Sequence, residues 1–148
     1  MNRRTFLKQS GKLSALSFLP LSSIASSQQR FKLGLQLYTV RDAMEKNPVQ
    51  ALKSLKAMGY EDFETYGYNT ESKTYYGYSP QEFKDILGDL GLSSSSGHYG
   101  VNNLMESSDD EVNRYVDSCI EGATILGDKY IVYPSLREAY RNASGFAN

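Results

Sequence analysis

The sequence predicts an α/β fold with a parallel sheet, built as the N-terminal half of a (β/α)8 TIM barrel with about four βα units. Three amphipathic stretches each end on an apolar residue followed by glycine, and a short strand-like run follows each of them. This strict alternation indicates right-handed crossovers between parallel strands. The expected first strand, 33–38, alternates apolar with small or polar residues, which fits a barrel wall better than a sheet buried on both faces.

The first 25 residues predict a signal peptide of the twin-arginine type. A basic start precedes a moderately apolar stretch, and Ala25 provides the small residue that a cleavage site needs. Residues 3–8 read Arg-Arg-Thr-Phe-Leu-Lys, an order that resembles the twin-arginine export signal and implies a periplasmic or secreted location. The apolar stretch is too short and interrupted to span a membrane, so no stable membrane anchor is expected. An ordinary secretory leader is the alternative.

The rest of the chain divides into a short linker, residues 26–31, and one small domain, residues 32–148. Removing the leader removes four basic residues and no acid, so 16 basic against 17 acidic residues become 12 against 17, a formal charge of −5. Such a chain lacks the basic surface that nucleic acid requires, which excludes a nucleic-acid partner. One histidine and one cysteine also exclude a zinc finger and an internal disulfide.

Helices and strands are placed in order by their end signals. Helix starts are marked by capping residues, Asn47 before Pro48, and then Ser79 and Ser108, each three residues before a glutamate. Each helix ends at a glycine, which adopts the left-handed conformation of a C-terminal cap without strain. These glycines are Gly59, Gly91 and Gly127. The expected strands are residues 33–38, 60–65, 92–97 and 129–133.

Four strands are half of the eight that a complete barrel of about 250 residues contains. After the fourth strand the sequence offers only one short helix, at 136–142. We therefore expect the N-terminal part of a longer protein, with a four-stranded open domain as the alternative. Because a half barrel leaves two parallel edges uncovered, pairing into a homo-oligomer is a further alternative. Cys119 lies on the apolar stripe of the third helix and is expected to be a small core residue.

Functional groups of parallel βα proteins gather at the carboxyl ends of the strands. That rule selects Tyr38, Glu64 and His98, which follow or end three different strands and should meet at one rim. Glu64 suits the acceptance of a substrate hydroxyl or a proton, and its alternative role is that of a solvated acid. His98 suits hydrogen-bond donation, metal ligation or proton transfer near neutral pH, and its alternative role is that of a hydrogen-bonded loop residue.

Two neighbouring features have weaker functional interpretations. Arg41 could bind an anionic group, but the adjacent Asp42 favours a local ion pair. The tyrosine-rich loop 66–78 could stack on sugar rings, although tyrosine among glycine and polar residues is also ordinary loop material. No phosphate-binding glycine loop, serine-nucleophile elbow or zinc-binding helix motif occurs in the sequence.

Four segments recur in an order that is typical of one enzyme family. They are LGLQLYTVRD (33–42), MGYEDFE (58–64), Gly91-Leu92 with Gly97-His98, and LGDKYIVYP (126–134). Together they resemble the sugar phosphate isomerase/epimerase family, whose members are TIM barrels similar to xylose isomerase. The resemblance implies isomerisation or epimerisation of a sugar or related polyol, by proton transfer next to a carbonyl with the help of a divalent metal. The metal ligands of the family lie on later strands, which this sequence lacks.

By the same resemblance, Glu64 and His98 are expected to contact the substrate, and Gln36 and Tyr38 are lower-ranked candidates. No catalytic residue and no metal ligand is assigned in this sequence, which is expected to be inactive alone. An exported location favours a free sugar, keto-sugar or inositol-like polyol over a phosphorylated one. Two alternatives are a secreted carbohydrate-binding barrel without catalysis and the related AP endonuclease barrels, which require several histidines and a cationic surface.

Overall fold

The computed structural model describes residues 31–135. The expected signal peptide, the linker up to residue 30 and the expected helix at 136–142 lie outside these described residues. The chain divides into two units, residues 1–31 and 32–148, and residues 32–135 of the second unit carry the sheet and its helices. None of the helices within 31–135 has the length and apolar character to cross a bilayer.

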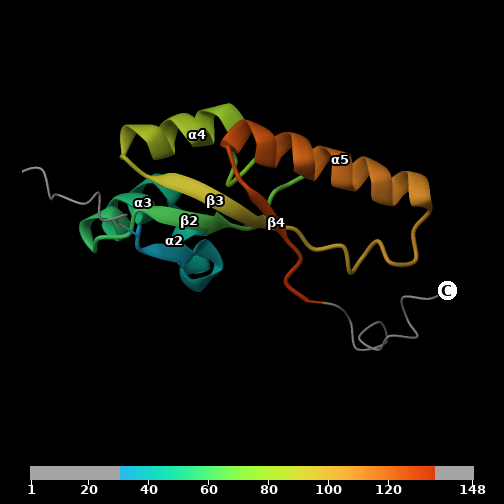
Figure 1. Ribbon diagram of the computed structural model, residues 1–148, viewed down its shortest axis with the longest axis horizontal. Coiled ribbons are helices and arrows are strands. Elements are labelled where there is room, and N and C mark those ends of the chain that lie inside the picture. The colour runs from blue at the N-terminus through green and yellow to red at the C-terminus, as the bar shows by residue number, and fades with distance from the viewer. Residues whose placement is uncertain (1–30, 136–148) are drawn as a thin grey trace, which may run out of the picture. The chain divides into compact units, whose positions relative to one another are not determined.

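Four parallel strands alternate with helices along the described chain. The strands pair in the order β1-β2-β3-β4, and each neighbouring pair is parallel. The strands are β1 (Gly34–Gln36), β2 (Asp62–Thr65), β3 (Ser93–His98) and β4 (Tyr130–Val132). The helices are η3 (Leu37–Val40), α2 (Arg41–Lys46), α3 (Pro48–Ala57), α4 (Pro80–Asp89) and α5 (Asp109–Leu126). The predicted α/β class with four parallel strands is confirmed, and Figure 1 shows α4 and α5 running along one side of the sheet.

The three predicted helices begin and end where their capping residues indicate. Asn47 accepts a hydrogen bond from the Gln50 amide, and Ser79 and Glu82 form a reciprocal capping box. Ser108 accepts a hydrogen bond from the Glu111 amide at the start of α5. The glycines that follow the helices, Gly59, Gly91 and Gly127, have φ values of 94°, 62° and 95°. These left-handed conformations confirm the predicted helix ends.

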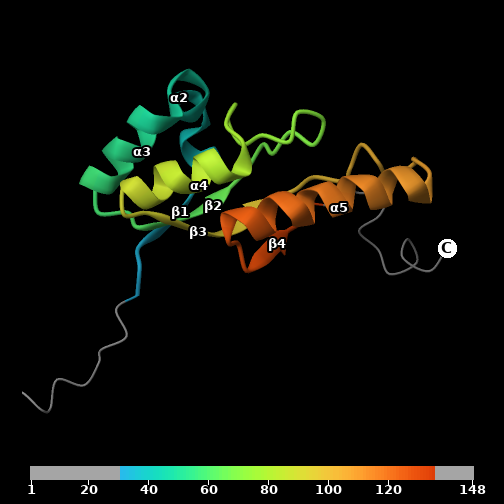
Figure 2. The same ribbon diagram turned by 90° about the horizontal axis from the view of Figure 1, so that it is seen from above.

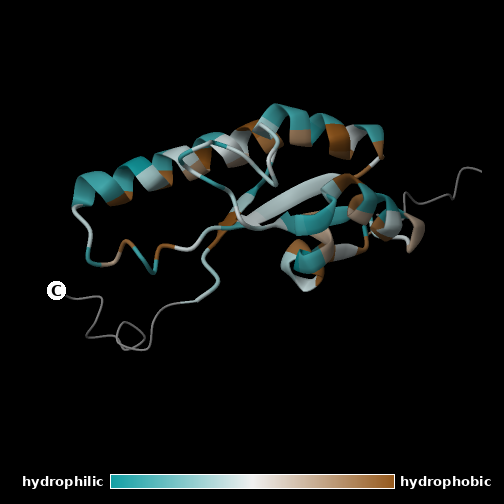
Figure 3. Cartoon of the chain, turned by 180° about the vertical axis from the view of Figure 1, so that it is seen from behind, coloured by the Kyte–Doolittle hydropathy of each residue, from teal (hydrophilic) through white to brown (hydrophobic). Residues whose placement is uncertain are grey.

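The main core lies between the sheet and α3 and α4, which Figure 2 shows side by side. Phe63 of β2 packs there with Leu52 of α3 and Phe83 of α4, each at most 1% exposed. A smaller cluster joins Cys119 to Tyr99 and Ala123, so the prediction that Cys119 is a core residue is confirmed. Figure 3 shows β3 as pale, because it consists of serine, glycine and histidine, whereas β4 is strongly apolar.

The first strand is shorter than predicted. It ends at Gln36, and Leu37 begins a 3-10 helix that α2 continues after one turn. This bend buries Leu37 completely in the core, whereas Leu33 and Tyr38 are 54% and 53% exposed. The alternation of residues over 33–38 therefore did not reflect one long strand with a single apolar face, because the burial of Leu37 depends on a turn.

The apolar stripe of α5 is only partly buried. Cys119 and Leu126 are 2% and 5% exposed, as expected for core residues, but Val116 and Ile120 are 37% and 46% exposed. On the neighbouring edge strand β4, Tyr130 and Ile131 are also exposed. No segment among residues 31–135 covers this side of the helix and strand, which explains why an apolar pattern here does not produce burial.

Asp128, which follows α5, is a partly buried acid whose protonation should change the stability of the fold. Both of its carboxylate oxygens are inaccessible to solvent. Burial raises the pKa of Asp128 to about 6; the Ser94 hydroxyl opposes this rise, and the negative charges of Asp62 and Glu64 add to it. Because the unfolded carboxyl loses its proton near 3.8, the folded state is penalised wherever the pH exceeds both values.

Asp128→Asn should therefore stabilise the chain at pH 8 by about 1–2 kcal/mol, a figure reduced for the partial exposure of the residue. The gain should shrink as the pH falls through 6 and vanish below about 4, where the wild-type carboxyl is protonated in both states. Urea denaturation across this pH range measures the effect. Asp117→Asn, on the exposed side of α5, is the control, and an equal gain in both variants at every pH would contradict the assignment.

Candidate functional site at the strand ends

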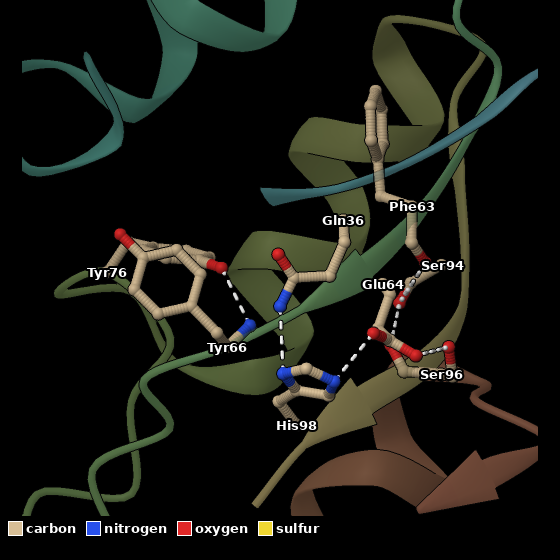
Figure 4. A network of polar contacts seen from close by, with 8 residues as sticks. All are labelled: Gln36, Phe63, Glu64, Tyr66, Tyr76, Ser94, Ser96 and His98. Atoms are coloured by element: carbon tan, nitrogen blue, oxygen red, sulfur yellow. Dashed lines mark hydrogen bonds and ion pairs between the residues drawn. The ribbon is translucent and has the colours of Figure 1, made fainter. Parts of the chain in front are cut away.

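Three strand ends bring Gln36, Glu64 and His98 into one hydrogen-bonded set. The His98 Nε2 lies 2.8 Å from Glu64 Oε1, and the Gln36 Nε2 lies 2.8 Å from His98 Nδ1. The Ser96 hydroxyl donates to the other carboxylate oxygen of Glu64 at 2.9 Å. Figure 4 shows these side chains together, while Phe63 points the other way, toward the helices. The convergence predicted for the carboxyl ends of the strands is therefore observed.

A β-bulge sets the register that assembles this set. Phe63 pairs with Ser94, but the next residue of β2, Glu64, pairs with Ser96, so Ser95 is an extra residue in β3. The bulge places Ser96 beside the Glu64 carboxylate. Since side chains alternate along a strand, His98 projects from the same face two residues later. Gln36 joins from β1, where it pairs directly with Glu64.

An open cleft of about 530 Å³ lies beside this set. Its lining includes Gln36 and His98 and the rings of Tyr38 and Tyr66, which meet edge to face with centroids 5.3 Å apart. The remaining lining residues are Gly67, Gly100, Pro134 and Ser135. Burial and the nearby charge of Glu45 raise the pKa of the Tyr66 phenol, so this hydroxyl is neutral at physiological pH. The cleft therefore combines aromatic faces with hydrogen-bonding groups.

The sequence-predicted residues take different places around the cleft. Gln36, Tyr38 and His98 line it directly, whereas Glu64 lies against His98. The side chains of His98 and Glu64 are 25% and 24% exposed, so both are partly buried. Both ring nitrogens of His98, the last residue of β3, are hydrogen-bonded within the protein, to Glu64 and to Gln36.

Arg41 lies at the rim rather than in the cleft. Its Nε is 3.7 Å from an Asp42 carboxylate oxygen, which confirms the predicted local ion pair. Its guanidinium also stacks over the Tyr38 ring, 4.9 Å from the centroid, a cation–π contact. Arg41 thus orients the ring of Tyr38 at the mouth of the cleft.

The tyrosine-rich loop 66–78 is mostly core rather than a sugar-stacking surface. Tyr75 is fully buried, and its hydroxyl pairs with that of Tyr99 at 2.6 Å. Tyr68 packs closely against Gly122 of α5. Of the loop tyrosines, Tyr66 alone lines the strand-end cleft. Its amide donates to the hydroxyl of the partly buried Tyr76, which fixes the position of Tyr66.

Sequence reasoning missed two residues of the site. Ser96 is one of four successive serines and was not among the predicted site residues; the bulge places it at Glu64. Tyr66 was one tyrosine among several, and no local signal separates it from the buried Tyr75. A second cleft, of about 500 Å³, lies between α2 and α3, but its lining is largely apolar and includes none of the strand-end residues.

The described residues do not form a metal site. Among residues 31–135, no group of three or more histidine, cysteine, aspartate or glutamate side chains is placed to hold a metal ion. Within the set, His98 has no free nitrogen, because both are hydrogen-bonded. No chemistry through a metal is therefore derived from these residues, and the divalent metal stays a prediction for the whole protein.

Gly97 gives a local test of this strand end. A Cβ at Gly97 would lie 2.7 Å from Tyr99 Cε2 and 2.8 Å from Thr65 Oγ1, both in buried side chains. Gly97→Ala should therefore lower the free energy of unfolding by about 1–3 kcal/mol through overpacking. Gly100→Ala, where a Cβ meets nothing within 4 Å, should change it little. Urea denaturation measures both variants, and equal values for the two would contradict this packing.

Comparison with known proteins places the fold. No protein-family model and no curated protein matches the chain. The chain is similar to a crystal structure of a sugar phosphate isomerase/epimerase from Parabacteroides distasonis ATCC 8503, with a TM-score of 0.63 and 24% identity, over 78% of this chain and 42% of that one. A second structure with the same description and organism gives a TM-score of 0.58 and 23% identity, over 71% of this chain and 42% of that one.

The likeness to these structures confirms the predicted fold class, part of a (β/α)8 barrel. The chain spans less than half the length of either structure. At 23–24% identity the comparison establishes the fold, and activity, substrate and partners do not follow from it.

Proposed function

We propose that this chain forms the sugar- or polyol-binding rim of an isomerase- or epimerase-like βα barrel. The observation that carries the proposal is the hydrogen-bonded set of Gln36, Glu64, Ser96 and His98 at the ends of β1, β2 and β3. A carboxylate and an amide suit the hydroxyl groups of a polyol, and the tyrosine rings beside them suit its apolar faces. The fold likeness to two sugar phosphate isomerases/epimerases supports the same class.

For the whole protein, the proposed reaction is proton transfer next to a carbonyl of the bound sugar or polyol. A divalent metal, when bound through residues outside 31–135, would polarise that carbonyl. The role of the described residues is to bind and orient the ligand. Glu64 accepts a hydrogen bond from a substrate hydroxyl, and Tyr38 and Tyr66 line the cleft. The chain by itself is proposed to bind its ligand without turning it over.

Export is part of the proposal and is supported by the arginine pair and the following apolar stretch in residues 3–25. Most sugar phosphates are cytoplasmic, so a periplasmic or secreted protein would act on unphosphorylated ligands. The proposed ligand class is therefore a free sugar, a keto-sugar or an inositol-like polyol.

Calorimetric titration of the chain with a panel of free aldoses, ketoses and cyclic polyols tests the binding proposal. At least one of these ligands is expected to bind, and binding by none of them would contradict the proposed function. For the complete protein, the expected result is exchange of the carbon-bound hydrogen next to the carbonyl with deuterated solvent. Binding without such exchange would indicate a carbohydrate-binding barrel, and turnover of a sugar phosphate alone would overturn the proposed ligand class.

A further inference from the structure

We infer that Gln36 is a positioning residue that holds His98 neutral, with its proton on Nε2, and so presents Glu64 to the ligand as a pure hydrogen-bond acceptor. The position of the proton on His98 follows from its hydrogen bonds to Gln36 and Glu64. The consequence for the ligand rests on the proposed function, because it concerns what binds in the cleft.

The donor and acceptor roles follow from the chemistry of the atoms in contact. The amide nitrogen of Gln36 can only donate, so the His98 Nδ1 that it approaches at 2.8 Å must accept and carries no proton. The Glu64 oxygen at 2.8 Å from His98 Nε2 accepts, so Nε2 carries the proton. A charged imidazolium would need an acceptor at both nitrogens. Gln36 therefore selects one neutral tautomer of His98.

The hydrogen bonds of Glu64 likewise show that its carboxylate acts only as an acceptor. Its two oxygens accept from His98 Nε2–H and from the Ser96 hydroxyl, which fixes the plane of the carboxylate. Each oxygen keeps a further lone pair, and neither has a proton to offer. A group that binds to Glu64 must then be a donor, such as a sugar hydroxyl.

The charges around Glu64 also favour an uncharged ligand. A neutral His98 leaves the charge of Glu64 without a cationic partner, and Asp62 lies two residues earlier on β2. The nearby cations are directed elsewhere, since Lys32 donates to Ser93 and Arg41 pairs with Asp42 at the rim. An anionic group placed at Glu64 would be repelled. The ligand class that this polarity selects is an uncharged polyol that offers hydroxyl donors.

Nitrogen-15 NMR of the imidazole tests the inference, because His98 is the one histidine of the whole sequence and its signals need no assignment. The expected pattern at neutral pH is one protonated nitrogen, Nε2, and one unprotonated nitrogen, Nδ1. In Gln36→Glu, which replaces the donor by an acceptor of the same shape, both nitrogens should be protonated. Gln36→Met, of similar length and without charge, removes the donor to Nδ1, so more of the rings than in wild type should carry a proton on Nδ1.

Two results would overturn the inference: a wild-type ring protonated on Nδ1, or a ring that stays neutral in Gln36→Glu. Dispersed amide signals in each variant establish that it is folded, and Gln36→Asp offers a second acceptor variant with the same expected outcome if Gln36→Glu does not fold.

The ligand consequence is tested with a matched pair, fructose and fructose 6-phosphate. Wild type should bind fructose at least about tenfold more tightly than its phosphate, because like charges at the site oppose the anion. Tighter binding of the phosphate would overturn the ligand consequence. Binding of neither would count against the proposed function, whereas the imidazole pattern would still decide the inference about Gln36.

Discussion

Phe63→Ala is expected to lower the free energy of unfolding by about 3–5 kcal/mol. The ring is 1% exposed and lies where β2 meets α3 and α4, so its removal leaves a cavity that these elements cannot fill without moving. Phe63 also precedes Glu64, and its packing against the helices keeps the carboxylate on the opposite face of the sheet. Urea denaturation followed by circular dichroism measures the loss.

Phe31→Ala is the matched control, because the same side chain is removed from a position that is 86% exposed. Its expected effect is within about 0.5 kcal/mol of wild type. Equal losses in the two variants would show that the core is not where the structure places it.

Glu64→Ala is expected to weaken binding of an uncharged polyol by about 10- to 100-fold. A hydrogen bond to a charged group contributes about 1.5–3 kcal/mol, which corresponds to that range of affinity. The substitution also removes the acceptor that His98 Nε2 and the Ser96 hydroxyl share. Calorimetric titration with the tightest ligand of the sugar panel measures the change.

Glu106→Ala is the control for charge, because Glu106 is an exposed acid in the loop before α5 and, unlike Glu64, makes no contact with His98 or Ser96. It should bind with wild-type affinity. Wild-type affinity in Glu64→Ala, with the chain still folded, would remove Glu64 from the ligand contacts.

The helices were predicted well from the sequence because capping residues and glycines next to each helix determine where it begins and ends. Asn47, Ser79 and Ser108 cap the helices that they were expected to cap, and glycines at left-handed φ values follow them. The first strand was predicted too long because the alternation over 33–38 is compatible with a strand, whereas the bend after Gln36 is set by the burial of Leu37 against distant helices. Helix α2 was missed for the same reason.

The site was predictable in part. Strand-end position was enough to select Glu64 and His98, because parallel strands carry their carboxyl ends to one edge. The contact of Ser96 with Glu64 was not predictable, because it depends on a one-residue bulge in a run of four serines that are alike in sequence. Tyr66 lines the cleft and Tyr75 does not, because tertiary packing buries the Tyr75 ring in the core.

Binding of a sugar or polyol in the strand-end cleft is tested most directly by following side-chain NMR signals during titration with the tightest uncharged ligand. We expect the signals of the His98 imidazole and of the Tyr38 and Tyr66 rings to shift together and to saturate at one ligand concentration. Met58, in the cleft between α2 and α3, should stay unchanged. Shifts at Met58 without a shift at His98 would place ligand binding elsewhere and contradict the proposed function.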